Sequence, residues 1–192
     1  KNYQDWWVCE KLLRRKRIIF RVIGDKKVGM GHIQRALTLA HEITDHEIIF
    51  VCEEKSQVAV IHLEGFDYLL KVWSSDEIEN GIVALEPDLI INDILDSDPN
   101  YIRKIRAKNI SVINFEDLGE GAELTNLTIN ELYDDPLIAG ENILWGQEYF
   151  FVREEFDDAK PNKFHETIQG LLIMFGGTDP NDYTRKILRI VK

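Results

Sequence analysis

The strongest constraint on the fold is a regular alternation between short β-branched runs and segments of helical periodicity. Strands are expected at 17–23, 47–52, 68–72, 89–92 and 110–115, and helices from near His32 and over 56–64, 76–85 and 99–107. Helices of about ten residues between successive strands are the connections of a mainly parallel sheet. Because such crossovers are right-handed, the pattern predicts a doubly wound, Rossmann-like α/β domain.

The chain is expected to have four parts, in order 1–16, 17–153, 154–169 and 170–192. The first is predicted to be a helix with Asp5 as its N-cap and a linker from a preceding module. The second is the Rossmann-like domain, with two further short strands at 127–129 and 143–145. The third is polar and is predicted to be a linker.

The fourth part is predicted to be the first strand and helix of a second domain. The strand is expected at 170–175 and the helix at 181–191, with Asp179 or Thr178 capping that helix. Since the chain starts with Lys1 rather than Met, we expect it to be a piece of a longer polypeptide.

Composition excludes several classes of function. A net charge of −11 argues against broad nucleic-acid binding, which needs a cationic surface. Cys9 and Cys52 do not form a CxxC pair, so we expect no disulfide framework, no zinc site and a reducing cytoplasm. No apolar run approaches the roughly 20 residues of a membrane span, so no membrane-spanning segment is expected.

The main candidate for chemistry is the loop 24–31, which joins the first strand to the first helix. Gly29 and Gly31 permit a tight turn and a close approach of the backbone to a ligand. At the helix start, His32 is expected to stay neutral and act as a general base, and Arg35 to meet a phosphate or carboxylate. The alternative is that His32 is only a cap residue. The loop matches neither a Walker A motif nor the dinucleotide fingerprint.

Other polar residues are expected at the same sheet edge. Asp93 and Asp96 follow one strand, and Glu116 and Asp117 follow another. Each is equally compatible with a cap or turn role, although their convergence favours a site. A second glycine loop, 176–180, is either a phosphate cradle or a plain strand-to-helix turn.

Taken together, these motifs resemble a known enzyme family. The run 29–40 resembles the GxGHxxRxLxLA signature of the UDP-sugar hydrolases of the pseudaminic acid pathway, to which proteins of spore-coat polysaccharide synthesis are related. Further similar segments follow in the same order: Asn92-Asp93 with Asp96, Glu116-Asp117, 126–130, 149–156 and 172–180 with Thr184. The resemblance covers about residues 17–192.

The resemblance implies a two-domain GT-B fold, close to the MurG-like glycosyltransferases, of which this chain is the N-terminal half. The implied reaction is hydrolysis of UDP-2,4-diacetamido-2,4,6-trideoxy-β-L-altropyranose at the anomeric carbon, with release of UDP. It implies His32 as the general base and requires no metal or cofactor. The implied substrate-binding residues are Gly29, Gly31, Arg35, Asp93, Asp117, Asn130, Gly176, Gly177, Thr178 and Asp179.

The sequence departs from the family pattern in two ways. Glu116 replaces the first Asp of the usual pair, and most of the second domain lies outside the 192 residues. We therefore expect negligible UDP-sugar turnover by this chain alone. Two alternatives stay open. One is a GT-B glycosyltransferase. The other is an accessory module of a CMP-N-acetylneuraminic acid synthetase-type fusion protein, because 5–17 resembles the junction that follows such a cytidylyltransferase.

Overall fold

A computed structural model describes residues 2–156, 158–160, 163, 166–176 and 179–191. Its centre is a seven-stranded sheet in the order β3-β2-β1-β4-β5-β6-β7, and every neighbouring pair is parallel. The strands are β1 (Arg17–Val22), β2 (Glu47–Glu53), β3 (Leu69–Trp73), β4 (Leu89–Asp93), β5 (Ser111–Phe115), β6 (Leu127–Asn130) and β7 (Ile143–Trp145). The predicted α/β class and the Rossmann-like alternation are confirmed.

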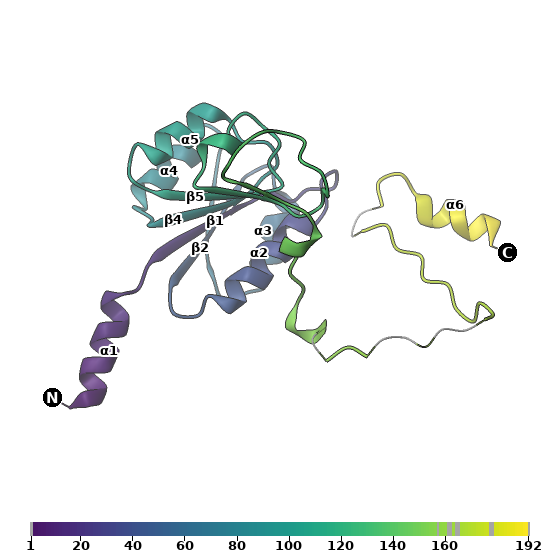
Figure 1. Ribbon diagram of the computed structural model, residues 1–192, viewed down its shortest axis with the longest axis horizontal. Coiled ribbons are helices and arrows are strands. Elements are labelled where there is room, and N and C mark those ends of the chain that lie inside the picture. Colours follow the sequence, from purple (N-terminus) through teal and green to yellow (C-terminus); the bar gives the residue numbers. More distant parts are fainter. Residues whose placement is uncertain (1, 157, 161–162, 164–165, 177–178, 192) are drawn as a thin grey trace.

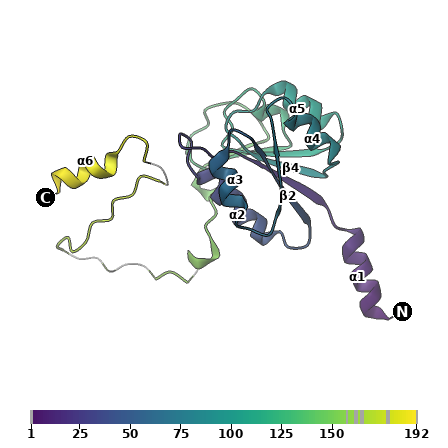
Figure 2. The same ribbon diagram turned by 180° about the vertical axis from the view of Figure 1, so that it is seen from behind.

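Helices cover both faces of this sheet, as Figures 1 and 2 show. The helices that join the strands are α2 (Gly31–Glu42), α3 (Gln57–Leu63), α4 (Ile78–Ala84) and α5 (Pro99–Arg106). Three short 3-10 turns follow at Ala122–Leu124, Gln147–Tyr149 and Glu154–Phe156. The boundaries of the connecting helices and of the strands agree with the predicted ones to within a residue or two.

The two faces carry separate cores because successive strand residues point to opposite sides. On one side, Phe20 stacks on Phe50, with ring centroids 5.3 Å apart, and both pack under α2 and α3. On the other side, Ile19 and Ile49 pack with Ile102 and other apolar residues of α4 and α5. The alternation along β1 thus fixes which face each helix covers.

The sheet order places a switch point between β1 and β4. From β1 the chain proceeds outward to β2 and β3, then returns to pair β4 with the other side of β1. The loops that follow β1 and β4 therefore diverge, and they leave a crevice at the carboxyl ends of these two strands. This is where open α/β sheets bind ligands.

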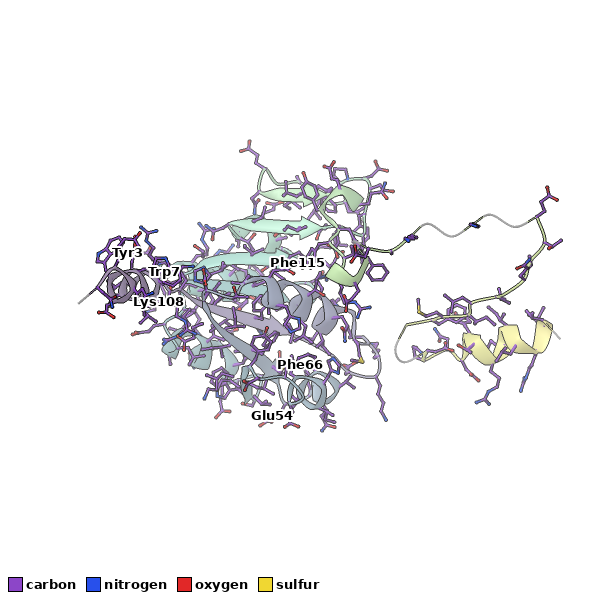
Figure 3. All side chains as sticks on the ribbon, turned by 90° about the horizontal axis from the view of Figure 1, so that it is seen from below. Tyr3, Trp7, Glu54, Phe66, Lys108 and Phe115 are labelled. Atoms are coloured by element: carbon purple, nitrogen blue, oxygen red, sulfur yellow. The ribbon has the colours of Figure 1, made fainter. Side chains whose placement is uncertain are left out.

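The N-terminal helix α1 (Tyr3–Leu13) begins earlier than predicted. Its N-cap is Asn2, whose side chain accepts from the backbone of Asp5, while Asp5 bonds back to the Asn2 backbone. The prediction of Asp5 as N-cap is therefore wrong, because Asn2 completes a capping box with Asp5 as its third-residue partner. Figures 1 and 3 show that α1, which carries Tyr3 and Trp7, projects from the amino end of β1.

The expected strand over 170–175 is absent. These residues have no regular secondary structure, and no strand of the described chain pairs with them. A single strand cannot satisfy its backbone groups without a neighbour, and the described residues form no sheet that pairs with this segment. The following helix, α6 (Tyr183–Ile190), does form. The N-cap position is Asp182 and not the predicted Asp179 or Thr178, but the Asp179 carboxylate accepts from the first two helix amides, of Tyr183 and Thr184, both at 2.9 Å.

Candidate functional site

The loop after β1 is shaped by one aspartate and one glycine. Asp25 accepts hydrogen bonds from the amides of Lys27 and Val28, at 2.7 and 2.8 Å, and the Gly29 amide donates to the Asp25 carbonyl at 2.9 Å. These bonds close a turn that leaves Gly29 with a φ of 86°. Other residues rarely adopt this conformation, so the backbone itself requires glycine there.

Gly31 is a different case. It is the first residue of α2, its φ is not in the left-handed region, and a Cβ built on it meets nothing within 4 Å. Neither conformation nor packing within the described chain requires glycine at this position. Met30, the N-cap, provides no side-chain hydrogen bond, so its side chain does not satisfy the first amides of α2.

His32 and Asp93 meet at the switch point. His32 Nδ1 forms a hydrogen bond with Asp93 Oδ1, and Asp93, the last residue of β4, is 1% exposed. A carboxylate at Nδ1 favours the tautomer with the proton on that atom, which leaves the lone pair on Nε2. Nε2 has no hydrogen-bond partner among the described residues. It is therefore free to accept a proton from a bound water or substrate.

Arg35, one turn further along α2, locks this pair in place. Its Nε and Nη2 each donate to Asp93 at 2.7 Å, and its Nη1 donates to Glu131 Oε1 at 2.7 Å. Burial alone would lower the pKa of Arg35, but the hydrogen bonds to Asp93 and Glu131 outweigh burial and raise it. The guanidinium also lies over the ring of Phe115, 5.2 Å from its centroid. All three guanidinium nitrogens are thus occupied by protein carboxylates.

Two glutamates complete the cluster. Glu116 Oε1 accepts from the amides of Glu131 and Leu132, at 2.8 and 3.3 Å, and lies 3.5 Å from Nη1 of Arg35. The second oxygens of Glu116 and Glu131 are buried and have no hydrogen-bond partner. Burial raises the pKa of Glu116 above its ordinary value, although the charge of Arg35 opposes this shift.

The cluster forms one wall of a cavity of about 560 Å³. Its polar lining consists of His32, Gln34, Arg35, Thr38, Glu116, Glu131 and Arg153. Its apolar side consists of Leu95, Leu132, Phe150, Phe151, Val152 and Phe156, with Tyr133. Leu95 and Glu116 have φ values of 69° and 51°, an uncommon conformation for non-glycine residues that is often found in binding sites.

The structure brings His32, Arg35 and Asp93 together and gives Asp117 and Asn130 other partners. Asp117 is fully buried, and both of its oxygens accept hydrogen bonds, from Ser97, Asn114 and Gly119. Asn130 forms two hydrogen bonds with the Asp117 backbone, at 2.9 and 3.1 Å. Both residues hold the loops around the cavity, and direct contact with substrate stays a prediction for them.

Gly176 and Asp179, which belong to the glycine loop before α6, do not line this cavity. Figure 1 shows that the C-terminal segment with α6 extends away from the sheet. Asp179 uses its carboxylate to cap α6. Gly177 and Thr178 lie outside the described residues. A substrate-binding role for this loop also stays a prediction.

Sequence reasoning did not single out Glu131 or the aromatic wall at Phe150 and Phe151. Glu131 was detectable by the rule that identified Asp93, because it directly follows the end of β6. No local sequence pattern identifies the aromatic wall, because Phe150 and Phe151 come close to α2 only in the folded chain. Asp96 accepts from the Leu118 amide at 3.1 Å and does not line the cavity.

The described residues contain no group of three or more His, Cys, Asp or Glu side chains placed to hold a metal ion. In that same part of the chain, no helix combines the length and the apolar character needed to cross a membrane.

Fold and site together define an open parallel α/β domain with a histidine–carboxylate pair at its switch point. No model of a known protein family matches the chain. It is distantly related to two proteins, each alignment covering 86% of the chain. The uncharacterized protein MJ1062 of Methanocaldococcus jannaschii is 29% identical over 183 residues. The spore coat polysaccharide biosynthesis protein SpsG of Bacillus subtilis is 23% identical over 175 residues. The matches span 37% and 52% of these relatives' lengths.

Proposed function

We propose that this chain is the N-terminal half of a two-domain nucleotide-sugar enzyme of surface-polysaccharide synthesis, which hydrolyses a UDP-activated diacetamido-trideoxy sugar. The observation that carries the proposal is the His32–Asp93 pair at the carboxyl edge of the sheet, with Nε2 of His32 directed to no described partner. The distant relation to a spore coat polysaccharide biosynthesis protein supports the biological setting.

The proposed reaction follows from the geometry of His32. A water molecule transfers a proton to Nε2 as its oxygen attacks the anomeric carbon of the sugar. The bond between that carbon and the diphosphate oxygen breaks, and its electron pair leaves with UDP. The products are UDP and the free sugar, and His32 holds the proton until solvent removes it. Asp93 stabilises the imidazolium that forms, as a buried carboxylate does in catalytic triads.

The cavity supports a sugar rather than a phosphate as its occupant. Arg35, the buried cation of the cavity, is already paired with Asp93 and Glu131. The other arginine that lines the cavity, Arg153, is exposed and lies 3.9 Å from Glu155. The candidate donors for the diphosphate are therefore the uncapped amides of α2, beside Gly31, and Arg153 at the rim. Uridine recognition is assigned to the second domain.

The test is UDP release from UDP-2,4-diacetamido-2,4,6-trideoxy-β-L-altropyranose by the full-length polypeptide that contains these residues. We expect His32→Ala to slow release by roughly a hundredfold to ten-thousandfold, the usual contribution of a general base. His46→Ala is the matched control, because His46 lies at the opposite end of the sheet, where it accepts from the Lys16 amide. Unchanged release by His32→Ala would refute the base assignment. Release only with an acceptor sugar present would indicate a transferase.

A further inference from the structure

Two glutamates that line the cavity, Glu116 and Glu131, share the same arrangement of their carboxyl groups, and the stability of the fold does not require it. Each side chain fixes one carboxyl oxygen to the protein and leaves the other buried without a partner. Glu131 is fixed by Nη1 of Arg35, and Glu116 by the amides of Glu131 and Leu132. Their side chains are 3% and 7% exposed.

A buried carboxyl oxygen without a partner is costly. Leaving such a group unsatisfied costs on the order of 1–3 kcal/mol, and more when it is charged. Here two such oxygens, Oε2 of Glu116 and Oε2 of Glu131, belong to side chains that line the same cavity. Both side chains are anchored by their other oxygen, so neither is free to turn outward to solvent. The arrangement is that of a receptor whose acceptors become satisfied on binding.

The character of the cavity defines what it accepts. Three carboxyl groups, of Asp93, Glu116 and Glu131, share the guanidinium of Arg35, so an anionic ligand group is disfavoured beside the two glutamates. Leu132, Phe150 and other apolar side chains line the same cavity. A fitting group therefore carries an N–H or O–H donor directly beside an apolar surface.

We infer that Glu116 and Glu131 are specificity-determining residues that bind the acylamino substituent of a sugar, with its N–H toward their free oxygens and its methyl group on the apolar wall. This inference rests on the proposed function and names the part of the substrate that the cavity recognises. A plain sugar hydroxyl would use the glutamates but not the wall. An ammonium group would have to lose strongly held water against the same wall.

Glutamine substitutions test the inference sharply, because the anchors dictate their orientation. In Glu131→Gln, Arg35 requires the amide oxygen on its side, so the NH₂ group replaces the free oxygen in the cavity. In Glu116→Gln, the amides of residues 131 and 132 impose the same choice. Each variant keeps its anchor and presents only donors to the ligand. Glu54→Gln is the control, since Glu54 is exposed and lies well away from Phe115 in Figure 3.

The experiment measures binding of N-acetylglucosamine, glucosamine and glucose to the 192-residue chain by saturation-transfer NMR. Amide shifts of Leu132 and Phe151 locate the bound sugar in the wild type. We expect N-acetylglucosamine to bind best, through its acetyl methyl group, and each cavity variant to bind roughly tenfold to a hundredfold more weakly. Thermal unfolding verifies that the variants are folded.

Absence of N-acetylglucosamine binding to the wild type, preference for glucose or glucosamine, or unchanged binding by folded Glu116→Gln and Glu131→Gln would overturn the inference. The probes contain no nucleotide, so this result is independent of UDP release. Sugar binding without UDP release would refute the proposed hydrolysis and keep the acylamino site. UDP release with unaltered sugar binding in both variants would support the proposed hydrolysis and refute the acylamino site.

Discussion

Arg35 and Asp93 form a two-point ion pair in which Nε and Nη2 each donate to a different carboxylate oxygen at 2.7 Å. Asp93 also carries the hydrogen bond to Nδ1 of His32, so one buried carboxylate connects the arginine to the candidate base. The planar guanidinium fits this geometry, and its third nitrogen reaches Glu131. The position of His32 therefore depends on Asp93, which is itself held by Arg35 of α2.

Replacement of Arg35 by lysine is expected to weaken the fold and the site together. A lysine ammonium cannot donate along two parallel directions and also reach Glu131, so at least one buried carboxylate loses a partner. We expect the free energy of unfolding in urea to fall by about 1–3 kcal/mol. Arg103→Lys is the control, because Arg103 is exposed on α5. Equal stability of the two variants would show that the two-point pair is energetically unimportant.

Asp93→Asn tests the charge that faces His32. Asparagine is nearly isosteric, but its NH₂ group cannot accept, so it loses one of the two hydrogen bonds from Arg35 and has no charge to stabilise an imidazolium. We expect UDP release by the full-length polypeptide to slow by roughly a hundredfold or more, with little change in KM. A raised KM at unchanged kcat would instead identify Asp93 as a substrate-binding residue, the role that the family resemblance implies.

The fold could be predicted almost entirely from the sequence, because hydrophobic periodicity is local. An apolar run such as 47–52 predicts a buried parallel strand without information from the rest of the chain. The site could be predicted only in part. The positions of the strand ends predict which acidic residues lie at the carboxyl edge of the sheet. Asp93 and Asp117 both satisfy this criterion, yet their hydrogen-bond partners differ. Asp117 binds Ser97 and Asn114, whereas Asp93 binds His32 and Arg35, and only the fold decides this.

The stability of the chain is expected to depend on pH through Glu116. Burial raises the pKa of this carboxyl in the folded chain, while Arg35 and the nearby Glu131 are the charged groups that face it. The folded state therefore holds the proton more tightly than the unfolded state. As pH rises through the interval between the two pKa values, wild-type stability falls relative to Glu116→Gln, which has no proton to lose. Urea unfolding of both proteins from pH 4 to pH 8 measures this difference. A difference that is independent of pH would contradict the raised pKa.

The two cysteines are expected to differ sharply in reactivity. Cys52 is buried in β2, and burial raises the pKa of its thiol to about 12, so it holds almost no thiolate at neutral pH. Cys9 is exposed on α1. A thiol reagent such as Ellman's reagent should therefore modify Cys9 alone in the native chain and both cysteines in urea. Cys9→Ser is the matched control and should leave no fast-reacting thiol. Rapid modification of native Cys52 would contradict the packing of β2 beneath α3.

Gly31 provides a test of where the substrate approaches the backbone. Because Gly31 is helical and an added Cβ meets nothing, Gly31→Ala is expected to leave stability unchanged or raise it by roughly 0.5–1 kcal/mol. Gly24→Ala is the contrasting variant. Its Cβ would lie 2.4 Å from Ile33 Cδ1 and 3.2 Å from Ala59 Cβ, so we expect a loss of about 1–3 kcal/mol.

The activity of Gly31→Ala then decides the role of this glycine. If the diphosphate lies against the first amides of α2, the new methyl group occupies the space it needs, and KM for the UDP-sugar should rise at least tenfold while thermal stability holds. Such a separation of stability from KM has no explanation within the fold, because nothing in the described chain touches the added carbon. Wild-type KM in this variant would mean that the substrate does not approach the start of α2, and the diphosphate would have to be placed elsewhere.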